Sequence, residues 1–242
     1  CTTCQSPYAS PATTTTYYVT TPAGCAPTDS VTVSVGGVPV TASASRDSIC
    51  PGDTTQLFAF TCEPVLFYDG FEDGTYNQWT NAGGGYTISA TTSTAAVGNY
   101  SLQLSGGNWV GFDGVFTTFN PDTTDYAGFY VRSSSTFNYD AFVIVGDNNT
   151  QTTWGIMFFY ADGSGFFNMN GIANPYNTNQ WYHIEYKNVD FISRTFDYYI
   201  DNVLIQSNVL FNDSSSTYIS QIHLFNFDFG STAYYDDIII GA

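Results

Sequence analysis

Residues 180–206 read QWYHIEYKNVDFISRTFDYYIDNVLIQ, and this stretch decides the fold. Residues 196–200 and 203–206 are short runs of aromatic and β-branched residues, which favour β-strands. They flank Asp201-Asn202, a two-residue loop whose side chains tolerate the positive φ angles of a tight hairpin turn. The stretch therefore predicts antiparallel strands joined by short turns.

The same pattern recurs along most of the chain. Residues 141–146 and 152–160 are apolar runs joined by a polar turn, and residues 222–229 and 233–240 supply two further strand candidates. No run shows the 3.6-residue periodicity of a helix. Eight or more antiparallel strands without a helix predict an all-β fold, the double-sheet jelly-roll sandwich.

Composition changes near residue 64, from Thr-, Pro- and Cys-rich to aromatic-, Asn- and Gly-rich, and we expect a domain boundary there. In the first part, residues 13–20 and 30–35 predict one strand pair. Residues 41–61 predict a second pair around a turn at residues 50–53. The sequence thus predicts β-structure of two kinds, one on each side of this boundary.

The first part resembles the immunoglobulin-like repeats of very large adhesins exported by gliding bacteria. The resemblance rests on TTTTYYVTTPAGCAPTDSVTVSV at residues 13–35 and SASRDSICPGDTTQLFA at residues 43–59. It implies the end of one repeat over residues 1–40, and the start of a second repeat or linker strands over residues 41–63. It also implies a secreted, repetitive stalk without enzyme chemistry, and a chain that is an internal or processed piece of a longer protein.

Residues 64–242 resemble concanavalin-A-like and laminin-G-like sandwiches. The resemblance rests on QWYHIEY at residues 180–186 and FDYYIDNVLI at residues 196–205, where those families read Trp-x-His and then Tyr-x-Asp-Gly. Asn202 stands where Gly is usual, and it still tolerates the turn. The resemblance implies an antiparallel jelly roll that binds a ligand without catalysis.

The opening DGFEDG at residues 69–74 and the ending DDI at residues 236–238 are similar to the frame of carbohydrate-binding and MAM-type jelly rolls. In that frame the first and last strands lie close together, which implies a structural Ca²⁺ held by carboxylates from separate strands. The expected ligands are Glu72 and Asp237, with Asp69 and Asp73 as further candidates. The alternative is that these residues are turn acids and solvated edge charges.

Charge restricts the partners. The chain has 4 Lys and Arg residues against 21 Asp and Glu residues, for a formal net charge of −17. Such a polyanion repels nucleic-acid phosphates and anionic lipid headgroups. No stretch approaches the roughly 18 uninterrupted apolar residues of a membrane span. We therefore expect no nucleic-acid partner and no membrane insertion.

The cysteines cluster in the first part of the chain. They are Cys1, Cys4, Cys25, Cys50 and Cys62. Clustered cysteines in an acidic chain predict disulfides formed in an oxidising, extracellular compartment, and proximity suggests Cys4 with Cys25 and Cys50 with Cys62. A zinc site at Cys1 and Cys4 is the alternative, but no second pair of ligands lies at finger spacing.

Residues suited to catalysis are few. The glutamates Glu63, Glu72 and Glu185 do not form the Glu-x-Asp-x-x-Glu pattern that glucanases of the concanavalin-A-like fold place on one strand. The two histidines, His183 and His223, lie inside alternating strand patterns, and no Gly-x-Ser-x-Gly elbow is present. The sequence therefore predicts a protein that is not an enzyme.

Aromatic rings are the best candidates for a ligand site, because their flat faces can stack on pyranose rings. Trp109 follows the turn-like Gly-Gly-Asn, and Tyr176 lies in Asn-Pro-Tyr-Asn, so we expect both rings to be exposed and to bind glycan. Trp79, Trp154 and Trp181 lie in strand patterns and are expected in the core.

The leading hypothesis is therefore a non-catalytic segment of a secreted cell-surface adhesin, whose jelly roll binds glycan or another surface ligand. The alternative is a structural repeat or subunit of an extracellular fibre, in which the rings contact other copies or neighbouring modules. A lesser alternative is an accessory carbohydrate-binding module of a secreted glycoside hydrolase.

Overall fold

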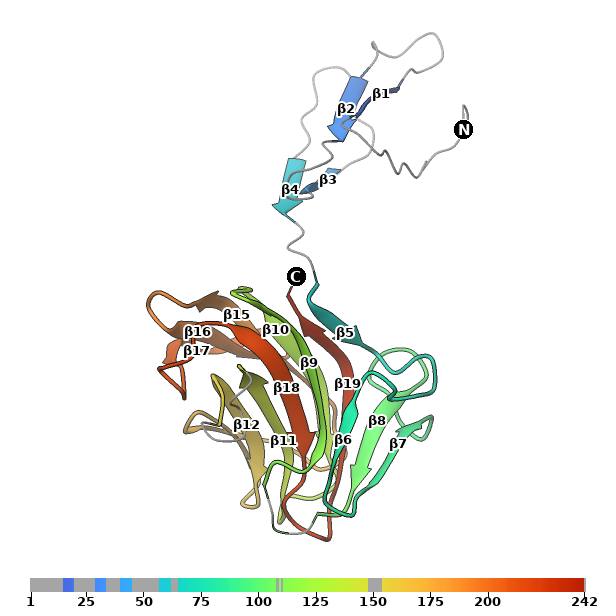
Figure 1. Cartoon of the computed structure of the whole chain (residues 1–242), viewed down its shortest axis with the longest axis vertical. Helices are drawn as coiled ribbons and strands as arrows, with labels where there is room; N and C mark the ends of the chain where they lie inside the picture. Colours follow the sequence, from blue (N-terminus) through green and yellow to red (C-terminus); the bar gives the residue numbers. More distant parts are fainter. Residues whose placement is uncertain are drawn as a thin grey trace. The chain divides into compact units, whose positions relative to one another are not determined.

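The computed structural model describes residues 15–19, 29–33, 40–44, 57–61, 65–107, 109, 111–147 and 154–241. The chain divides into two compact units, Cys1–Glu63 and Pro64–Ala242, which are both drawn in Figure 1. All five cysteines lie outside the described residues, so the disulfides and the alternative zinc site stay predictions.

The first unit contains two antiparallel strand pairs. Strand β1 (Thr15–Val19) pairs with β2 (Asp29–Val33), and β3 (Val40–Ala44) pairs with β4 (Leu57–Thr61). These are the two pairs that the alternation of Thr, Val and aromatic residues predicted. Their assignment to immunoglobulin-like repeats stays a prediction.

The second unit is built from strands that run in sequence order. They are β5 (Phe67–Asp69), β6 (Thr80–Gly83), β7 (Thr87–Thr91), β8 (Ser101–Ser105), β9 (Gly114–Asp122), β10 (Ala127–Ser133), β11 (Tyr139–Gly146), β12 (Met157–Asp162), β13 (Phe166–Met169), β14 (Ile172–Pro175), β15 (Tyr182–Asp190), β16 (Thr195–Ile200), β17 (Val203–Leu210), β18 (Ile219–Phe225) and β19 (Thr232–Ile240).

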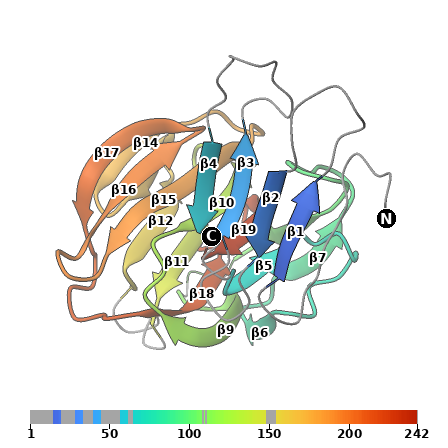
Figure 2. The same ribbon diagram turned by 90° about the horizontal axis from the view of Figure 1, so that it is seen from above.

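These strands form two antiparallel sheets that pack as a sandwich (Figures 1 and 2). The eight-stranded sheet has the order β17-β16-β15-β10-β19-β8-β7, with β5 paired to β19. The seven-stranded sheet has the order β14-β13-β12-β11-β18-β9-β6. This confirms the all-β jelly-roll fold. Among the described residues, no helix is long and apolar enough to cross a membrane.

The turn between β16 and β17 confirms the predicted hairpin. Asp201 and Asn202 both have positive φ angles, 50° and 64°, as a two-residue turn of this kind requires. The backbone N–H of Asp201 donates to the carbonyl of His183 at 2.8 Å, which fixes the hairpin against β15. Local turn chemistry therefore sets the register of this sheet edge.

A single core fills the space between the two sheets. In β10, Ala127, Phe129 and Val131 alternate with outward-facing residues and are at most 1% exposed. The ring of Phe129 packs edge-on against Phe159 of the other sheet, with 5.5 Å between centroids. Apolar side chains of alternating phase from both sheets thus hold the sandwich together.

The seven-stranded sheet has a second apolar layer on its outer face. In β11, Ala141, Val143 and Val145 belong to the core, while Phe142 and Ile144 point the other way. Both outward side chains are nevertheless buried, at 6% and 0% exposed. Antiparallel sheets commonly present a polar outer face, so this layer marks a surface with a special role.

Candidate functional site

The outer face of the seven-stranded sheet carries a groove of about 280 Å³. Aromatic side chains from β11, β12 and β18, and from the segments beside β12 and β18, line it. They are Tyr139, Phe142, Trp154, Phe158, Tyr160, Phe225 and Phe227. Because β11 pairs with both β12 and β18, outward-facing rings from three neighbouring strands meet on one surface.

The rings on the floor of the groove stack on one another. Phe142 lies directly opposite Phe225 in the β11–β18 ladder, and their centroids are 4.4 Å apart at an interplanar angle of 16°. On the other side, Phe142 stacks on Tyr160 at 5.1 Å and 8°. These cross-strand pairs stabilise the sheet and give the floor a fixed shape.

Trp154 is the most open of the tryptophans that touch this groove, with 37% of its surface exposed. Its ring is tilted by 44° against Phe112 and by 53° against Phe158, at centroid distances of 4.3 and 4.8 Å. The expectation that Trp154 belongs to the core is therefore wrong. It precedes β12 at a positive φ angle of 64°, which places the ring outside the inward phase of that strand.

The other strand tryptophans behave closer to expectation. Trp79 is a core residue at 6% exposed, and its indole N–H donates to the Asp69 carboxylate at 2.9 Å. Trp181 is half-buried on the outer face of the eight-stranded sheet, where its indole N–H donates to the Thr94 hydroxyl at 3.1 Å.

His223 lies beneath the groove and is fully buried. Its ring packs between Phe112, Phe116 and Phe225, at centroid distances of 6.2, 5.7 and 5.7 Å. Nε2 lies 2.8 Å from the carbonyl oxygen of Asp113, so this nitrogen carries the proton of a neutral ring. Burial lowers the pKa of His223 to about 4, and the ring therefore holds a loop in place instead of acting as a base.

The loop before β9 closes one end of the groove. Phe112 packs on Trp154, and the neighbouring Asp113 contacts the Tyr86 hydroxyl, which also contacts the carbonyl of Asn226. Burial, followed by the hydrogen bond with Asp113, raises the pKa of Tyr86, so this phenol stays protonated. These contacts give the end of the groove rigid polar walls.

Trp109 is exposed, as the sequence predicts, with 64% of its surface accessible. Its backbone N–H donates to the carbonyl of Phe227, a groove residue, at 2.8 Å. Its ring meets the exposed ring of Phe229 edge-on, with 5.0 Å between centroids. The structure thus places Trp109 beside the groove, on the loops at the end of the sheet.

The expectation of an exposed Tyr176 is wrong. Its side chain is 6% exposed and stacks on Phe167 at 4.1 Å and 6°. Its hydroxyl donates to the carbonyl of Ser135 at 2.6 Å. The Asn-Pro-Tyr-Asn segment pairs as β14 with β13, which turns the ring into the core, so Tyr176 has no open face for a ligand.

The four acids expected to hold calcium do not converge. Asp69 is 6% exposed and accepts hydrogen bonds from the Phe71 N–H and the Trp79 indole, at 2.8 and 2.9 Å. Asp73 accepts from the N–H of Thr75 at 2.8 Å and so stabilises its own turn.

The two leading calcium candidates are also engaged separately. Glu72 accepts from the backbone N–H groups of Asn99 and Tyr100, at 2.9 and 2.8 Å. Asp237 bonds the Tyr68 hydroxyl and raises the pKa of that phenol to about 12. Among the described residues, no three His, Cys, Asp or Glu side chains form a group that could hold a metal. The expected ligand set is therefore wrong, and calcium binding stays a prediction from the resemblance.

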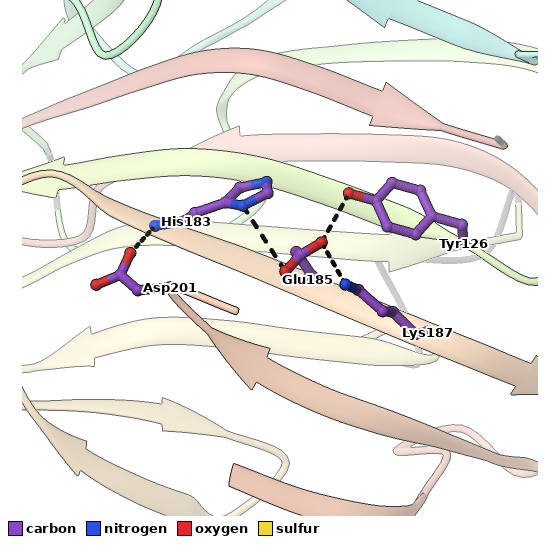
Figure 3. Close-up of polar contacts among 5 residues, drawn as sticks. All are labelled: Tyr126, His183, Glu185, Lys187 and Asp201. Atoms are coloured by element: carbon purple, nitrogen blue, oxygen red, sulfur yellow. Dashed lines mark hydrogen bonds and ion pairs between the residues drawn. The ribbon is translucent and has the colours of Figure 1, made fainter. Parts of the chain in front are cut away.

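A polar cluster lies on the outer face of the eight-stranded sheet (Figure 3). Glu185 is 4% exposed and pairs with Lys187 at 2.8 Å, and it also accepts a hydrogen bond from the Tyr126 hydroxyl at 3.3 Å. His183 Nδ1 lies 3.7 Å from the same carboxylate, and its ring stacks on Tyr130 at 4.3 Å. Glu185 is thus not isolated, as its sequence neighbours suggested, but the centre of a network.

This network has the character of a structural cluster. Desolvation lowers the pKa of His183, and the nearby Glu185 opposes that effect only in part. The backbone N–H of His183 donates to the side chain of Asp201 at 2.8 Å, which anchors the β16–β17 turn. A carboxylate this buried, already bound to a lysine and a phenol, is poorly placed to attack or protonate a substrate.

Sequence reasoning missed the groove, although a signal was present. Residues 141–145 read AFVIV, and residues 156–160 read IMFFY. A half-buried strand alternates apolar and polar residues, whereas runs that are apolar in both phases indicate burial on both faces. In an antiparallel sandwich, that signal indicates an outer face covered by rings.

Comparisons with known proteins identify the fold. The chain matches no protein-family model and no curated protein. Among solved structures, it is similar to "Cellulose induced protein, Cip1", at a TM-score of 0.53 and 19% identity, over 73% of this chain and 97% of that chain. It is also similar to the globular domain of T. cruzi calreticulin, at a TM-score of 0.54 and 13% identity, over 74% and 88%.

A third similar structure is described as "Sialidase", with a TM-score of 0.53 and 12% identity. The match covers 74% of this chain but only 18% of the sialidase chain. At identities this low, the similarities show a shared sandwich fold and nothing more about activity.

Proposed function

We propose that residues 64–242 form a glycan-binding module without catalytic activity, which holds its ligand in the aromatic groove. The observation that carries this proposal is a groove lined entirely by aromatic residues on the outer face of a sheet. Sugar rings present C–H faces that pack on aromatic rings, and sites for small ligands are concave and mostly apolar.

The chemistry of the groove supports binding over catalysis. Glycoside hydrolysis requires two carboxyl groups on either side of the scissile bond, at about 5–10 Å from one another. Every residue that lines the groove is aromatic, and the histidine beneath it is buried and neutral. The buried Glu185 network belongs to the other sheet.

A secreted, glycan-active protein is the context that best fits this module. The fold is shared with a cellulose-induced protein and with a segment that makes up 18% of a sialidase chain. An accessory carbohydrate-binding module therefore has more support than the adhesin stalk, which rests on the resemblance of the first unit. The clustered cysteines favour an extracellular location.

Affinity gel electrophoresis of the whole chain through soluble polysaccharides tests the proposal. We expect at least one polysaccharide to retard the protein, and Trp154→Ala to weaken that retardation about tenfold, because the open ring is lost. The matched control is Ile192→Ala, which removes an apolar side chain that is 96% exposed in the β15–β16 turn. A set of glucans, xylans, mannans and galactans that all leave mobility unchanged would contradict the proposal, as would equal effects of the two substitutions.

A further inference from the structure

We propose that the groove selects uncharged glycan chains, long enough to extend past the end of the sheet onto Trp109, and rejects chains that carry carboxylate or sulfate groups. This inference rests on the proposed function and deepens it. It follows from where the chain places its charges and its exposed rings.

The few cations of the chain lie away from the groove. Arg132 is in β10, Lys187 is in β15 and Arg194 is in the β15–β16 turn, so all three belong to the eight-stranded sheet. The fourth, Arg46, belongs to the first unit. Stacked sheets are about 10 Å apart, which exceeds the Debye length of about 8 Å in physiological salt. Those cations therefore cannot attract an anionic sugar to the opposite face.

Each of the three cations also has protein partners on its own face. Lys187 pairs with Glu185 and lies 4.8 Å from the centre of the Tyr199 ring. The Arg132 guanidinium lies 5.4 Å from the centre of the Tyr234 ring and donates to the side chain of Asn179.

Arg194 is engaged as well, because its guanidinium donates to the carbonyl of Ser214. Bound in this way, none of the three cations is free to reach around the sheet. An anionic glycan in the groove would have no counter-charge from them.

Acids, in contrast, border the groove. Asp228 accepts a hydrogen bond from the N–H of Tyr139 at 2.7 Å, and Asp162 lies opposite Tyr139 in the β11–β12 ladder. Asp113 closes the far end through Tyr86. Three acids at about 7–8 Å from a ligand charge together weaken its binding about tenfold in water-like dielectric. An uncharged sugar meets no such barrier.

Exposed rings continue from the groove toward Trp109. The chain segment of Phe227, a groove residue, holds the backbone of Trp109, and the Trp109 ring contacts that of Phe229. Tyr139, Phe229 and Trp109 are 47%, 60% and 64% exposed. An aromatic surface this open on a soluble protein marks a contact site, and only a chain of several sugars can cover it together with Trp154.

The test compares polymers that share a backbone and differ in charge. The pairs are hydroxyethylcellulose with carboxymethylcellulose, dextran with dextran sulfate, and carboxyl-reduced glucuronoxylan with glucuronoxylan. The whole chain is run through each polymer at low and high salt. We expect the neutral member of at least one pair to bind about tenfold more tightly at low salt, and the difference to shrink as salt screens the acids.

The outcomes separate this inference from the proposed function. Equal or tighter binding to the charged member of every bound pair would overturn the selectivity while leaving glycan binding intact. No retardation in any of the six polymers, or in the wider set above, would overturn both. For chain length, Trp109→Ala is expected to weaken polymer binding several-fold and leave disaccharide binding unchanged. Polymer binding equal to wild type in Trp109→Ala would overturn the extended path.

Discussion

Asp140 provides a direct test of how the sandwich tolerates a buried acid. Its side chain is 0% exposed, and the Ser133 hydroxyl donates to it at 2.8 Å. The ion pairs among the described residues both involve Glu185, so no cation stabilises an Asp140 anion. Burial raises the pKa of Asp140 from 3.8 to about 8, while hydrogen bonds from Ser133 and Ser231 lower it in part.

The sign of the pH dependence follows from this shift. The folded chain binds the Asp140 proton more tightly than the unfolded chain does, so this group favours folding most at low pH. The free energy of unfolding then falls by about 1.4 kcal/mol for each pH unit between 3.8 and about 8, and levels off above that. Between pH 6.5 and pH 8, the loss amounts to about 2 kcal/mol.

That interval avoids the other shifted groups of the core. Asp236 has its pKa raised to about 6, chiefly by burial, and so acts mainly below the interval. His223 has its pKa lowered from 6.5 to about 4, so its stabilising effect is complete above pH 6.5 and is lost only as pH falls toward 4. Asp140 is therefore the group of these three that changes the stability between pH 6.5 and pH 8.

Urea unfolding followed by tryptophan fluorescence measures the effect. The wild-type chain is expected to lose about 2 kcal/mol from pH 6.5 to pH 8, and Asp140→Asn, which cannot ionise, is expected to lose none of it. Asp125→Asn, a substitution at an exposed acid, should keep the wild-type slope. Parallel pH profiles for Asp140→Asn and the wild type would refute the reasoning.

Further predictions concern packing, the buried ion pair and calcium. Gly114→Ala is expected to cost more than about 2 kcal/mol of unfolding free energy by urea titration, because φ is +83° and the new Cβ would lie 2.3 Å from the Leu224 carbonyl oxygen. Gly171→Ala, with φ of +91° but open space around it, should cost about 1–2 kcal/mol, and an equal cost would contradict the packing argument. Glu185→Gln should lower stability by about 1–3 kcal/mol in the same assay, since it leaves a lysine unpaired, and unchanged stability would show that the pair contributes nothing. If the resemblance to calcium-binding jelly rolls holds, millimolar Ca²⁺ raises the melting temperature relative to EDTA and Glu72→Gln abolishes the rise, whereas no shift in the wild type would remove the calcium hypothesis.

The parts of the fold that depend on local chemistry could be predicted from the sequence. The β16–β17 hairpin follows from Asp201-Asn202, because positive φ angles at both positions are a property of the turn itself. Strand positions follow from runs of β-branched and aromatic residues. Neither inference requires knowing which strands become neighbours.

The groove could not be predicted in the same way, because it depends on pairings across the sheet. Phe142 and Phe225 are opposite each other only after β11 and β18 pair, although more than 80 residues separate them. Tyr176 was misplaced for the same reason, since its partner Phe167 reaches it through the β13–β14 ladder. The calcium set failed because nearby N–H groups satisfy each acid before any metal is needed.

The rings of the groove divide into a floor that holds the sheet and a rim that is open to a ligand. Phe142 and Phe225 are 6% and 0% exposed, so truncating either opens a cavity that costs about 3–5 kcal/mol, and any loss of affinity then reflects a damaged sheet. Trp154 and Tyr139 are 37% and 47% exposed, and truncating them removes surface that water already reaches. A rim substitution that lowers affinity at constant melting temperature therefore identifies a binding surface, whereas a floor substitution that lowers both identifies only a core.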